Sequence, residues 1–236
     1  MTSPGRGLFI TGTDTGVGKT QVTLGLMSCL HQRGLKVAGM KPVASGCYHT
    51  EHGLRNADAV AIQKLCSISV PYRDINPYAL EPAIAPHIAA EEVGTSISMA
   101  AIADAYQRIS QQVDWCLVEG VGGWLVPIDN HQTVAELVEY LSLPVVLVVG
   151  LRLGCLNHAL LSVESIERRN VRLMGWVANQ IDPSMARADR NITALLNRID
   201  APLIGAIPPV LSPSEATFSP YLVSGLTALM GKHLAT

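Results

Sequence analysis

Apolar residues fall in short continuous runs along this chain, and segments with helical spacing separate the runs. The runs do not alternate between apolar and polar positions, which is typical of strands buried on both faces of a parallel sheet. We therefore expect five or six buried strands. They lie at residues 7–11, 36–40, 115–118, 144–149, 173–178 and 203–207.

Helices are predicted between these strands. Residues 18–33 show an apolar period and end at Gly34, a residue suited to a helix C-terminus, and residues 56–66 also have helical spacing. Strand–helix alternation predicts an α/β fold: one doubly wound, mostly parallel sheet in a single domain over residues 1–236. The proline-rich region 66–98 lacks a period, so we expect a long excursion over the surface. The other predicted helices are 99–112, 156–169 and 187–199.

Composition narrows the class of protein. Hydrophobic residues make up 48% of the 236 residues and charged residues 15%, which is enough apolar side chain for a large core. The net charge is −2 and no run gathers five like charges, so nothing favours a nucleic-acid or membrane-surface role.

The expected location is the cytoplasm. Five scattered cysteines without a C-x-x-C pair favour a reducing compartment, and the first residues do not resemble a signal peptide. The longest apolar run, 143–150, is too short to span a bilayer.

A glycine-rich loop follows the first predicted strand. Residues 12–20 read GTDTGVGKT and lead directly into a helix, whose N-terminal N–H groups favour phosphate. Lys19 is expected to reach the β- and γ-phosphates of ATP, and the Thr20 hydroxyl to bind Mg²⁺. The usual P-loop pattern has glycine where this chain has Thr13, with Gly12 one position earlier.

Two carboxylates are candidates for the metal. Glu119 directly follows a buried strand and precedes a Gly-Val-Gly-Gly run, which lets backbone approach a ligand closely. Carboxylates complete the Mg²⁺ shell in many nucleotide sites. Asp58 lies in the first turn of a predicted helix, where an acidic side chain equally serves the helix dipole.

A second lysine, Lys41, follows the second predicted strand. Ligands in such sheets bind outside the carboxyl ends of the strands, so Lys41 is expected to face the same cleft as the P-loop. A lysine there can neutralise charge on a transferring phosphoryl group. Ser45 and Gly46 are expected to form a polar turn against substrate.

Two other patterns are less specific. His49 and His52 have no third ligand at metal spacing. Residues 153–158 open a helix after the fourth strand, and their N–H groups form a second possible anion site.

Seven runs together resemble the dethiobiotin synthetase family over nearly the whole chain. They are residues 11–20, 41–46, 53–58, 76–78, 119–124, 153–158 and 175–179. The resemblance implies a homodimeric enzyme that uses ATP, Mg²⁺ and CO₂ (or bicarbonate) to close a ureido ring on 7,8-diaminopelargonic acid in biotin synthesis. It also implies a carbamate that attacks the γ-phosphate, and a carbamic–phosphoric anhydride that the second amine opens.

The resemblance also implies residue roles. Lys41 and Lys19 would be catalytic, and Thr20, Asp58 and Glu119 would bind Mg²⁺. Substrate contacts would be Thr15, Lys41, Ser45, Gly122, Gly154, Cys155, Leu156 and Asn157, the last four holding the carboxylate of the substrate in the neighbouring subunit. Nucleotide contacts would be Thr13, Asp14, Thr15, Gly16, Val17, Gly18, Lys19, Thr20, Asp58, Glu119, Gly120, Val121, Gly122, Asn179, Gln180, Pro208, Pro209, Val210 and Glu215.

This chain departs from the family pattern at three positions. Gly16 stands where some members have a carboxylate, Gln180 where an Asp occurs, and Pro209 where a Trp occurs. ATP is the expected donor, and the last two departures leave open whether other nucleoside triphosphates are accepted.

Two other P-loop classes fit the sequence less well. A regulatory ATPase of the partitioning type typically has an additional lysine early in its P-loop, where this chain has Thr13-Asp14-Thr15. An amidoligase of corrinoid synthesis normally has a glutamine-hydrolysing domain, for which 236 residues leave no room.

Overall fold

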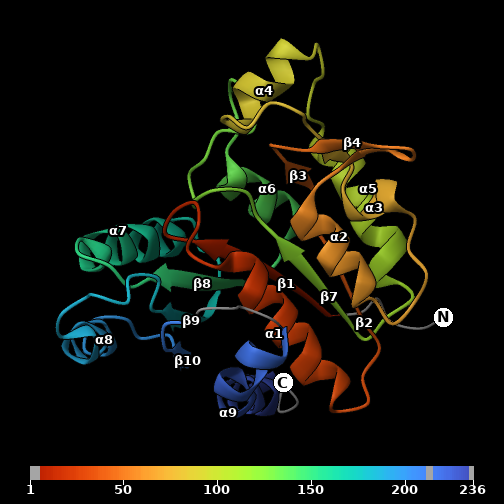
Figure 1. The fold of residues 1–236 in the computed structure, drawn as a ribbon. Coiled ribbons are helices and arrows are strands. Elements are labelled where there is room, and N and C mark those ends of the chain that lie inside the picture. The colour runs from red at the N-terminus through yellow and green to blue at the C-terminus, as the bar shows by residue number, and fades with distance from the viewer. Residues whose placement is uncertain (1–5, 211–214, 234–236) are drawn as a thin grey trace.

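A six-stranded sheet forms the centre of the protein, as a computed structural model describes it for residues 6–210 and 215–233 (Figure 1). The strand order is β10-β9-β8-β1-β7-β2, and every neighbouring pair is parallel. All the predicted strands are present, and the predicted α/β fold is confirmed. The strands are β1 (Arg6–Gly12), β2 (Val37–Met40), β7 (Trp115–Glu119), β8 (Val145–Gly150), β9 (Leu173–Asn179) and β10 (Leu203–Ile207).

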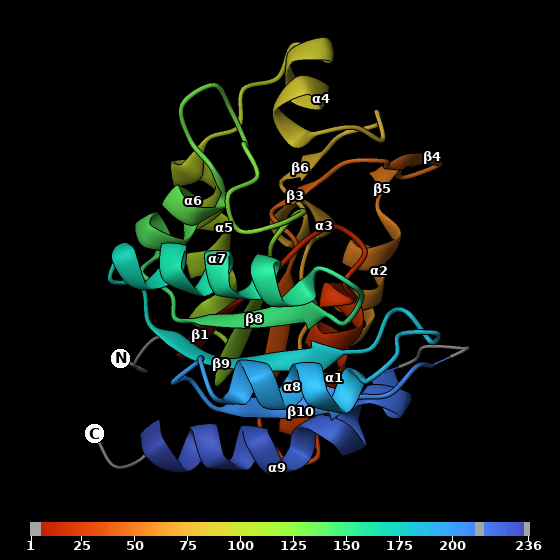
Figure 2. The same cartoon turned by 90° about the vertical axis from the view of Figure 1, so that its left-hand side faces the viewer.

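Helices cover both faces of this sheet, because successive residues of each strand point to opposite sides. Leu8 and Ile10 of β1 pack with α1 (Lys19–His31) and α9 (Glu215–His233). Figure 2 shows α9 below the sheet and α7 above it. The remaining long helices are α2 (Ala57–Lys64), α5 (Met99–Ser110), α6 (Val134–Leu141), α7 (Cys155–Arg168) and α8 (Ala188–Leu196).

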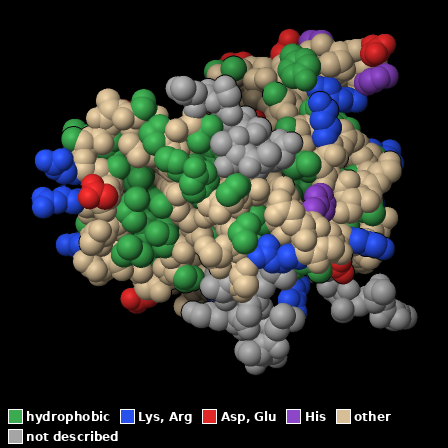
Figure 3. All heavy atoms as spheres, turned by 60° about the horizontal axis from the view of Figure 1, so that its bottom comes forward, with side chains coloured by type: hydrophobic (Ala, Val, Ile, Leu, Met, Phe, Trp, Pro, Cys, Tyr) green, Lys and Arg blue, Asp and Glu red, His purple; other side chains and the backbone are tan. Residues whose placement is uncertain are grey.

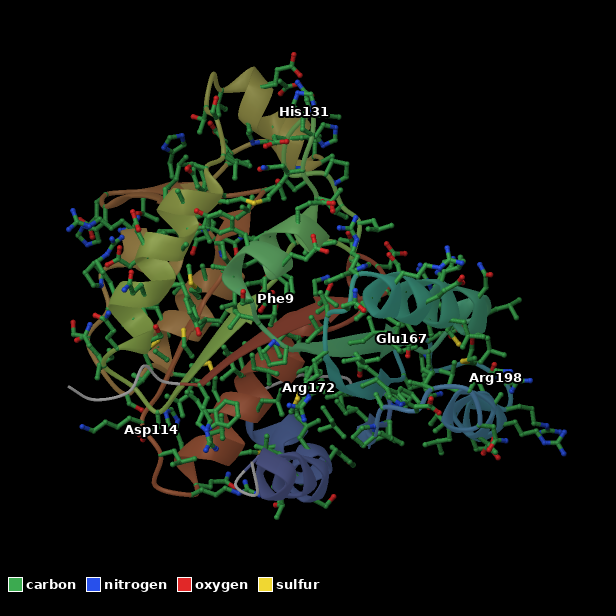
Figure 4. The ribbon with its side chains drawn as sticks, turned by 180° about the vertical axis from the view of Figure 1, so that it is seen from behind. Phe9, Asp114, His131, Glu167, Arg172 and Arg198 are labelled. Carbon is green, nitrogen blue, oxygen red and sulfur yellow. The ribbon has the colours of Figure 1, made fainter. Side chains whose placement is uncertain are left out.

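Phe9 of β1 points to the other face of the sheet from Leu8 and Ile10. Its side chain is fully buried and belongs to the apolar cluster that contains residues of α5 and α6. Figure 4 shows Phe9 in the interior, beneath α6. The sheet is thus doubly wound, and β1 lies in its middle with β8 and β7 as neighbours.

The region 66–98 is more than a surface excursion, and that expectation is wrong in part. It forms α3 (Tyr72–Ile75), β6 (Tyr78–Ala79) and α4 (Pro86–Glu92), and β6 pairs with the short strand β3 (Val43–Ala44). Ile75, Leu80 and Ala89 are at most 2% exposed, because they pack into the same cluster as Phe9. A separate hairpin joins β4 (Tyr48–Thr50) to β5 (Gly53–Arg55).

Two surface properties accompany this fold. Within residues 6–210 and 215–233, no helix combines the length and apolar character that crossing a bilayer requires. Lys and Arg side chains lie mainly around the margin of the face seen in Figure 3 and do not form a continuous basic surface there.

Helix α6 begins with a capping box. The Thr133 hydroxyl accepts from the backbone of the first turn, and Glu136 Oε2 accepts from Thr133 N at 2.7 Å. Arg169 lies 2.7 Å from Glu136 Oε1. Burial alone would raise the pKa of Glu136, but the bonds from Thr133 and Arg169 dominate and lower it to about 2.

This carboxylate should make stability depend on acid. Since the folded pKa lies below the unfolded value, Glu136 stabilises the fold above about pH 4.5, and the effect is lost as pH falls towards about 2. We expect Glu136→Gln to reduce the free energy of unfolding by about 1–2 kcal/mol at pH 7, after discounting for solvent screening. Urea denaturation at pH 7 and pH 3 should show the difference shrinking in acid. Glu164→Gln is the control, because Glu164 forms only an exposed ion pair with Arg168. If Glu136→Gln lowered the free energy of unfolding equally at both pH values, the lowered pKa of Glu136 would be contradicted.

Candidate active site

The P-loop connects β1 to α1 across the carboxyl edge of the sheet. Gly18 has φ +90°, and a Cβ atom there would lie 2.2 Å from Asn179 Nδ2. Both the backbone angle and the close approach therefore require glycine. Lys19 is 7% exposed, and its Nζ donates to Asp14 O at 2.9 Å, so the lysine curls back over the loop.

Further contacts hold the tip of this loop. Thr13 N donates to Val148 O at 3.0 Å, and Thr15 N donates to Asp14 Oδ1 at 2.7 Å. The other Asp14 oxygen pairs with Arg152, which follows β8. This ion pair was not predicted, since no periodic signal links two residues so far apart in the sequence.

Lys41 is the centre of an ion triad in which Lys41 and Glu119 are buried and Asp58 is partly exposed. It follows β2, and its Nζ lies 2.6 Å from Asp58 Oδ2 and 2.6 Å from Glu119 Oε1. Lys41 is 6% exposed and Glu119 is fully buried. The predicted approach of Lys41 to the P-loop side of the sheet is therefore realised, because β1, β7 and β2 are adjacent parallel strands.

The oxygen atoms around this triad fit a magnesium ion. Thr20 Oγ1 donates to Glu119 Oε1 at 2.8 Å, and the Asp58 side chain is 41% exposed. Among the described residues, Glu119 Oε2 is buried and has no hydrogen-bond partner. One hydroxyl and two carboxylates, with room for phosphate oxygens and water, are the oxygen donors that Mg²⁺ uses in nucleotide sites.

The two lysines have opposite electrostatic environments. Burial lowers the pKa of Lys19 to about 8, with Glu119 opposing the shift and Lys41 adding to it. Burial would also lower the pKa of Lys41, but its ion pairs with Glu119 and Asp58 raise it above the ordinary value. Lys41 is thus held as a cation, suited to an anionic partner.

A cleft of about 730 Å³ opens above these groups. The Ser45 hydroxyl is buried and lacks a hydrogen-bond partner within the described residues, and Ser45 lines this cleft. Predicted residues that line the cleft are Thr15, Gly16, Gly18, Lys19, Thr20, Lys41, Ser45, Asp58, Glu119, Val121 and Gly122. Residues that line it without having been predicted are Gln21, Asn56, Ala83, Ile84, Ala85, Pro86 and Val126.

The residues proposed to read the nucleobase lie on the other side of the P-loop and do not line this cleft. Asn179 ends β9, and its Nδ2 donates to Val17 O at 2.8 Å. Gln180 N donates to Ile207 O at 2.9 Å, so Gln180 lies beside the end of β10. The chain continues from that strand end into Pro208, Pro209 and Val210. Glu215 begins α9, and its side chain lies outside those that the structure describes.

The predicted carboxylate-binding segment also lies apart from the cleft. Gly154 precedes the first turn of α7 with φ +96°, and Cys155 is 2% exposed. The preceding Leu153 is 95% exposed. No residue from 154 to 157 lines the cleft of its own chain.

Comparison with known proteins defines the family. A family model described as an AAA domain matches residues 6–217. The ATP-dependent dethiobiotin synthetase BioD of Cellvibrio japonicus is 49% identical over 217 residues, which cover 92% of this chain and 95% of that protein. The same enzyme of Pseudomonas paraeruginosa is 46% identical, with 91% and 94% covered.

Solved structures agree on the fold. MinD of Aquifex aeolicus, in its complex with MinC, superposes with a TM-score of 0.61 at 18% identity, covering 96% of each chain. At that identity the likeness concerns the fold alone and gives no support to a regulatory ATPase. Close identity over nearly the full length of the synthetases, together with a P-loop beside a Lys41–Asp58–Glu119 triad, shows that the chain belongs to the ATP-dependent dethiobiotin synthetase family.

Proposed function

We propose that this protein makes dethiobiotin from 7,8-diaminopelargonic acid, CO₂ and ATP. The observation that most supports this reaction is the position of Lys41, a buried cation between two carboxylates beside the P-loop. The reaction brings an anionic carbamate next to a polyanionic triphosphate, and a fixed cation at their meeting point answers that electrostatic problem.

The proposed chemistry has three steps. One substrate amine adds to CO₂ and loses a proton, which forms a carbamate. A carbamate oxygen attacks the γ-phosphorus of ATP, the bond to the bridging oxygen breaks, and ADP leaves. The second amine then attacks the carbamoyl carbon of the mixed anhydride, expelling phosphate and losing a proton as the ring closes. Both amines belong to one molecule, so the last step is an intramolecular reaction that positioning favours.

Each charged group of the site has a place in this scheme. Lys19 holds the β- and γ-phosphates, and Lys41 bridges the carbamate and the γ-phosphate. Thr20, Asp58 and Glu119 would hold the magnesium ion, which when bound neutralises charge on the phosphates. Thr15, Ser45 and Gly122 line the cleft, where they would contact the diamine.

A product assay tests the proposal. The protein is incubated with ATP, Mg²⁺, bicarbonate and 7,8-diaminopelargonate, and dethiobiotin is measured by mass spectrometry. We expect product and an equal amount of ADP, with no product when the diamine or bicarbonate is omitted. ATP hydrolysis that continues without product would overturn the proposal and favour a regulatory ATPase.

We also propose a homodimer in which residues 154–157 of one subunit receive the carboxylate of the substrate bound to the other. The N-terminus of α7 attracts anions, and the fully exposed apolar Leu153 beside it suits a protein interface. Sedimentation at micromolar concentration should give a dimer, and Leu153→Asp should shift it towards monomer. A wild-type monomer would remove the shared site.

Two finer assignments belong to the same proposal. ATP is the proposed donor, with Asn179, which lies beside the P-loop, as a contact to its base. We place the protein in the cytoplasm, because the five cysteines are free thiols, which a reducing compartment maintains.

A further inference from the structure

Asn76 belongs to the family-like run 76–78 and has no part in the chemistry described above. It is 3% exposed and follows α3 directly. A buried asparagine must satisfy two donors and an acceptor, so its partners show what it holds in place.

The Asn76 amide binds the backbone of the catalytic lysine. Its Nδ2 donates to Lys41 O at 2.8 Å and to Tyr78 O at 3.2 Å. The preceding residue acts on the same peptide, since Lys41 N donates to Ile75 O at 2.8 Å. Both backbone polar groups of Lys41 are thus tied to the end of α3.

The other end of the Asn76 amide leads towards the proposed metal ligand. Asn76 Oδ1 accepts from the Tyr72 hydroxyl at 3.1 Å, and that hydroxyl accepts from Asn56 N at 2.7 Å. The Asn56 side chain in turn accepts from Asp58 N at 3.1 Å, which caps α2. A continuous chain of hydrogen bonds therefore joins the backbone of Lys41 to the backbone of Asp58.

This chain becomes a closed ring through the side chains, because Lys41 Nζ and Asp58 Oδ2 are 2.6 Å apart. In the proposed reaction, the Lys41 ammonium must turn to the carbamate and the Asp58 carboxylate to Mg²⁺, so their direct ion pair opens. The backbone network does not depend on that ion pair, and it would keep the two residues at a fixed separation during turnover.

We propose that Asn76 and Tyr72 are positioning residues that set the separation of Lys41 and Asp58 for phosphoryl transfer. This inference rests on the proposed function, because it assigns a task only if Lys41 and Asp58 act on ATP and its metal. Outer residues that orient catalytic groups influence activity as strongly as some direct contacts.

The protein offers a matched pair of tyrosines for a test. Tyr72→Phe removes only the hydroxyl. The ring remains stacked with the Arg55 guanidinium, whose central carbon lies 4.1 Å from the ring centroid. Tyr78→Phe removes a hydroxyl that accepts from Ser98 N at 2.8 Å, outside the network. Both tyrosines are half-buried and lie in the same segment, so their loss should lower the melting temperature to a similar extent.

We expect Tyr72→Phe to lower kcat about 10-fold, with Tyr78→Phe close to wild type. The gain in ATP affinity on adding saturating Mg²⁺ should shrink about 10-fold in Tyr72→Phe, while ATP affinity without Mg²⁺ stays unchanged. Asn76→Asp, which cannot donate to Lys41 O, should lower kcat at least as much. If Tyr72→Phe and Tyr78→Phe lower the melting temperature but share the wild-type kcat and Mg²⁺ response, the network is only structural and the inference fails.

A double-mutant cycle separates the two roles further. In an Asp58→Asn background, Tyr72→Phe should change kcat by less than about twofold, because the side chain at position 58, which the network positions, has already lost its charge. Additive effects of the two substitutions would overturn the inference. Failure of the proposed function is distinguishable, since the wild-type protein would then make no dethiobiotin at all.

Discussion

Lys41→Gln is expected to lower kcat for dethiobiotin formation about 1,000-fold, while the affinity for Mg·ATP changes by no more than about threefold. Glutamine is polar but one bond shorter, and it has no charge to stabilise the γ-phosphate as the carbamate attacks. The substitution also removes both ion pairs of a buried cation, which leaves Asp58 and Glu119 close together without compensation. Binding should therefore be measured with saturating Mg²⁺, which restores positive charge between the carboxylates.

Lys36→Gln is the control for this experiment, because Lys36 is exposed and directly precedes β2, whereas Lys41 directly follows it. Single-turnover kinetics would measure the chemical step, and calorimetry would measure nucleotide binding. Equal losses of turnover and of Mg·ATP affinity would mean that Lys41 only supports the nucleotide.

Glu119→Gln should have the second largest effect, a loss of about 100- to 1,000-fold in kcat/KM. Glu119 is fully buried, accepts from Thr20 and Lys41 through Oε1, and has Oε2 free of protein partners among the described residues. The amide retains the shape of the side chain but donates where a cation ligand is needed. The Mg²⁺ concentration for half-maximal activity should therefore rise at least about 10-fold.

Glu167→Gln provides the matched control, since Glu167 is exposed on α7 and does not line the cleft. Titration of Mg²⁺ at fixed ATP would measure the shift directly. A Glu119→Gln variant with a lower kcat but an unchanged Mg²⁺ midpoint would show that Glu119 serves Lys41 and does not bind the metal.

The strands were predictable because burial on both faces leaves a continuous apolar run, and the run Val145–Gly150 is an example. The C-terminal helix was not predicted, because Pro220 lies inside it and interrupts the periodic pattern. Region 66–98 was misjudged for a different reason. Its buried residues lie in very short elements that pair with β3 and the core cluster, and such pairings have no period to detect.

Some residues of the candidate site could likewise be predicted from the sequence, and others could not. Lys41 and Glu119 directly follow or end buried strands, so the rule that ligands bind at the carboxyl edge was enough to bring them together. Asp58 needed the family resemblance, because its position at a helix start has two explanations. The positioning role proposed for Asn76 and Tyr72 could not be predicted, since it depends on hydrogen bonds to segments up to 35 residues away.

The order of strands in the sheet also separates two tasks that a protein engineer would want to change independently. Lys41 and Glu119 stand on the β7–β2 side of β1, whereas the proposed base contacts stand beyond β8, at the ends of β9 and β10. A mutational library confined to Gln180 and Pro208–Val210 would leave every group of the ion triad untouched. If the proposed base contacts hold, nucleotide preference can be selected in this scaffold without disturbing the residues proposed to perform the chemistry.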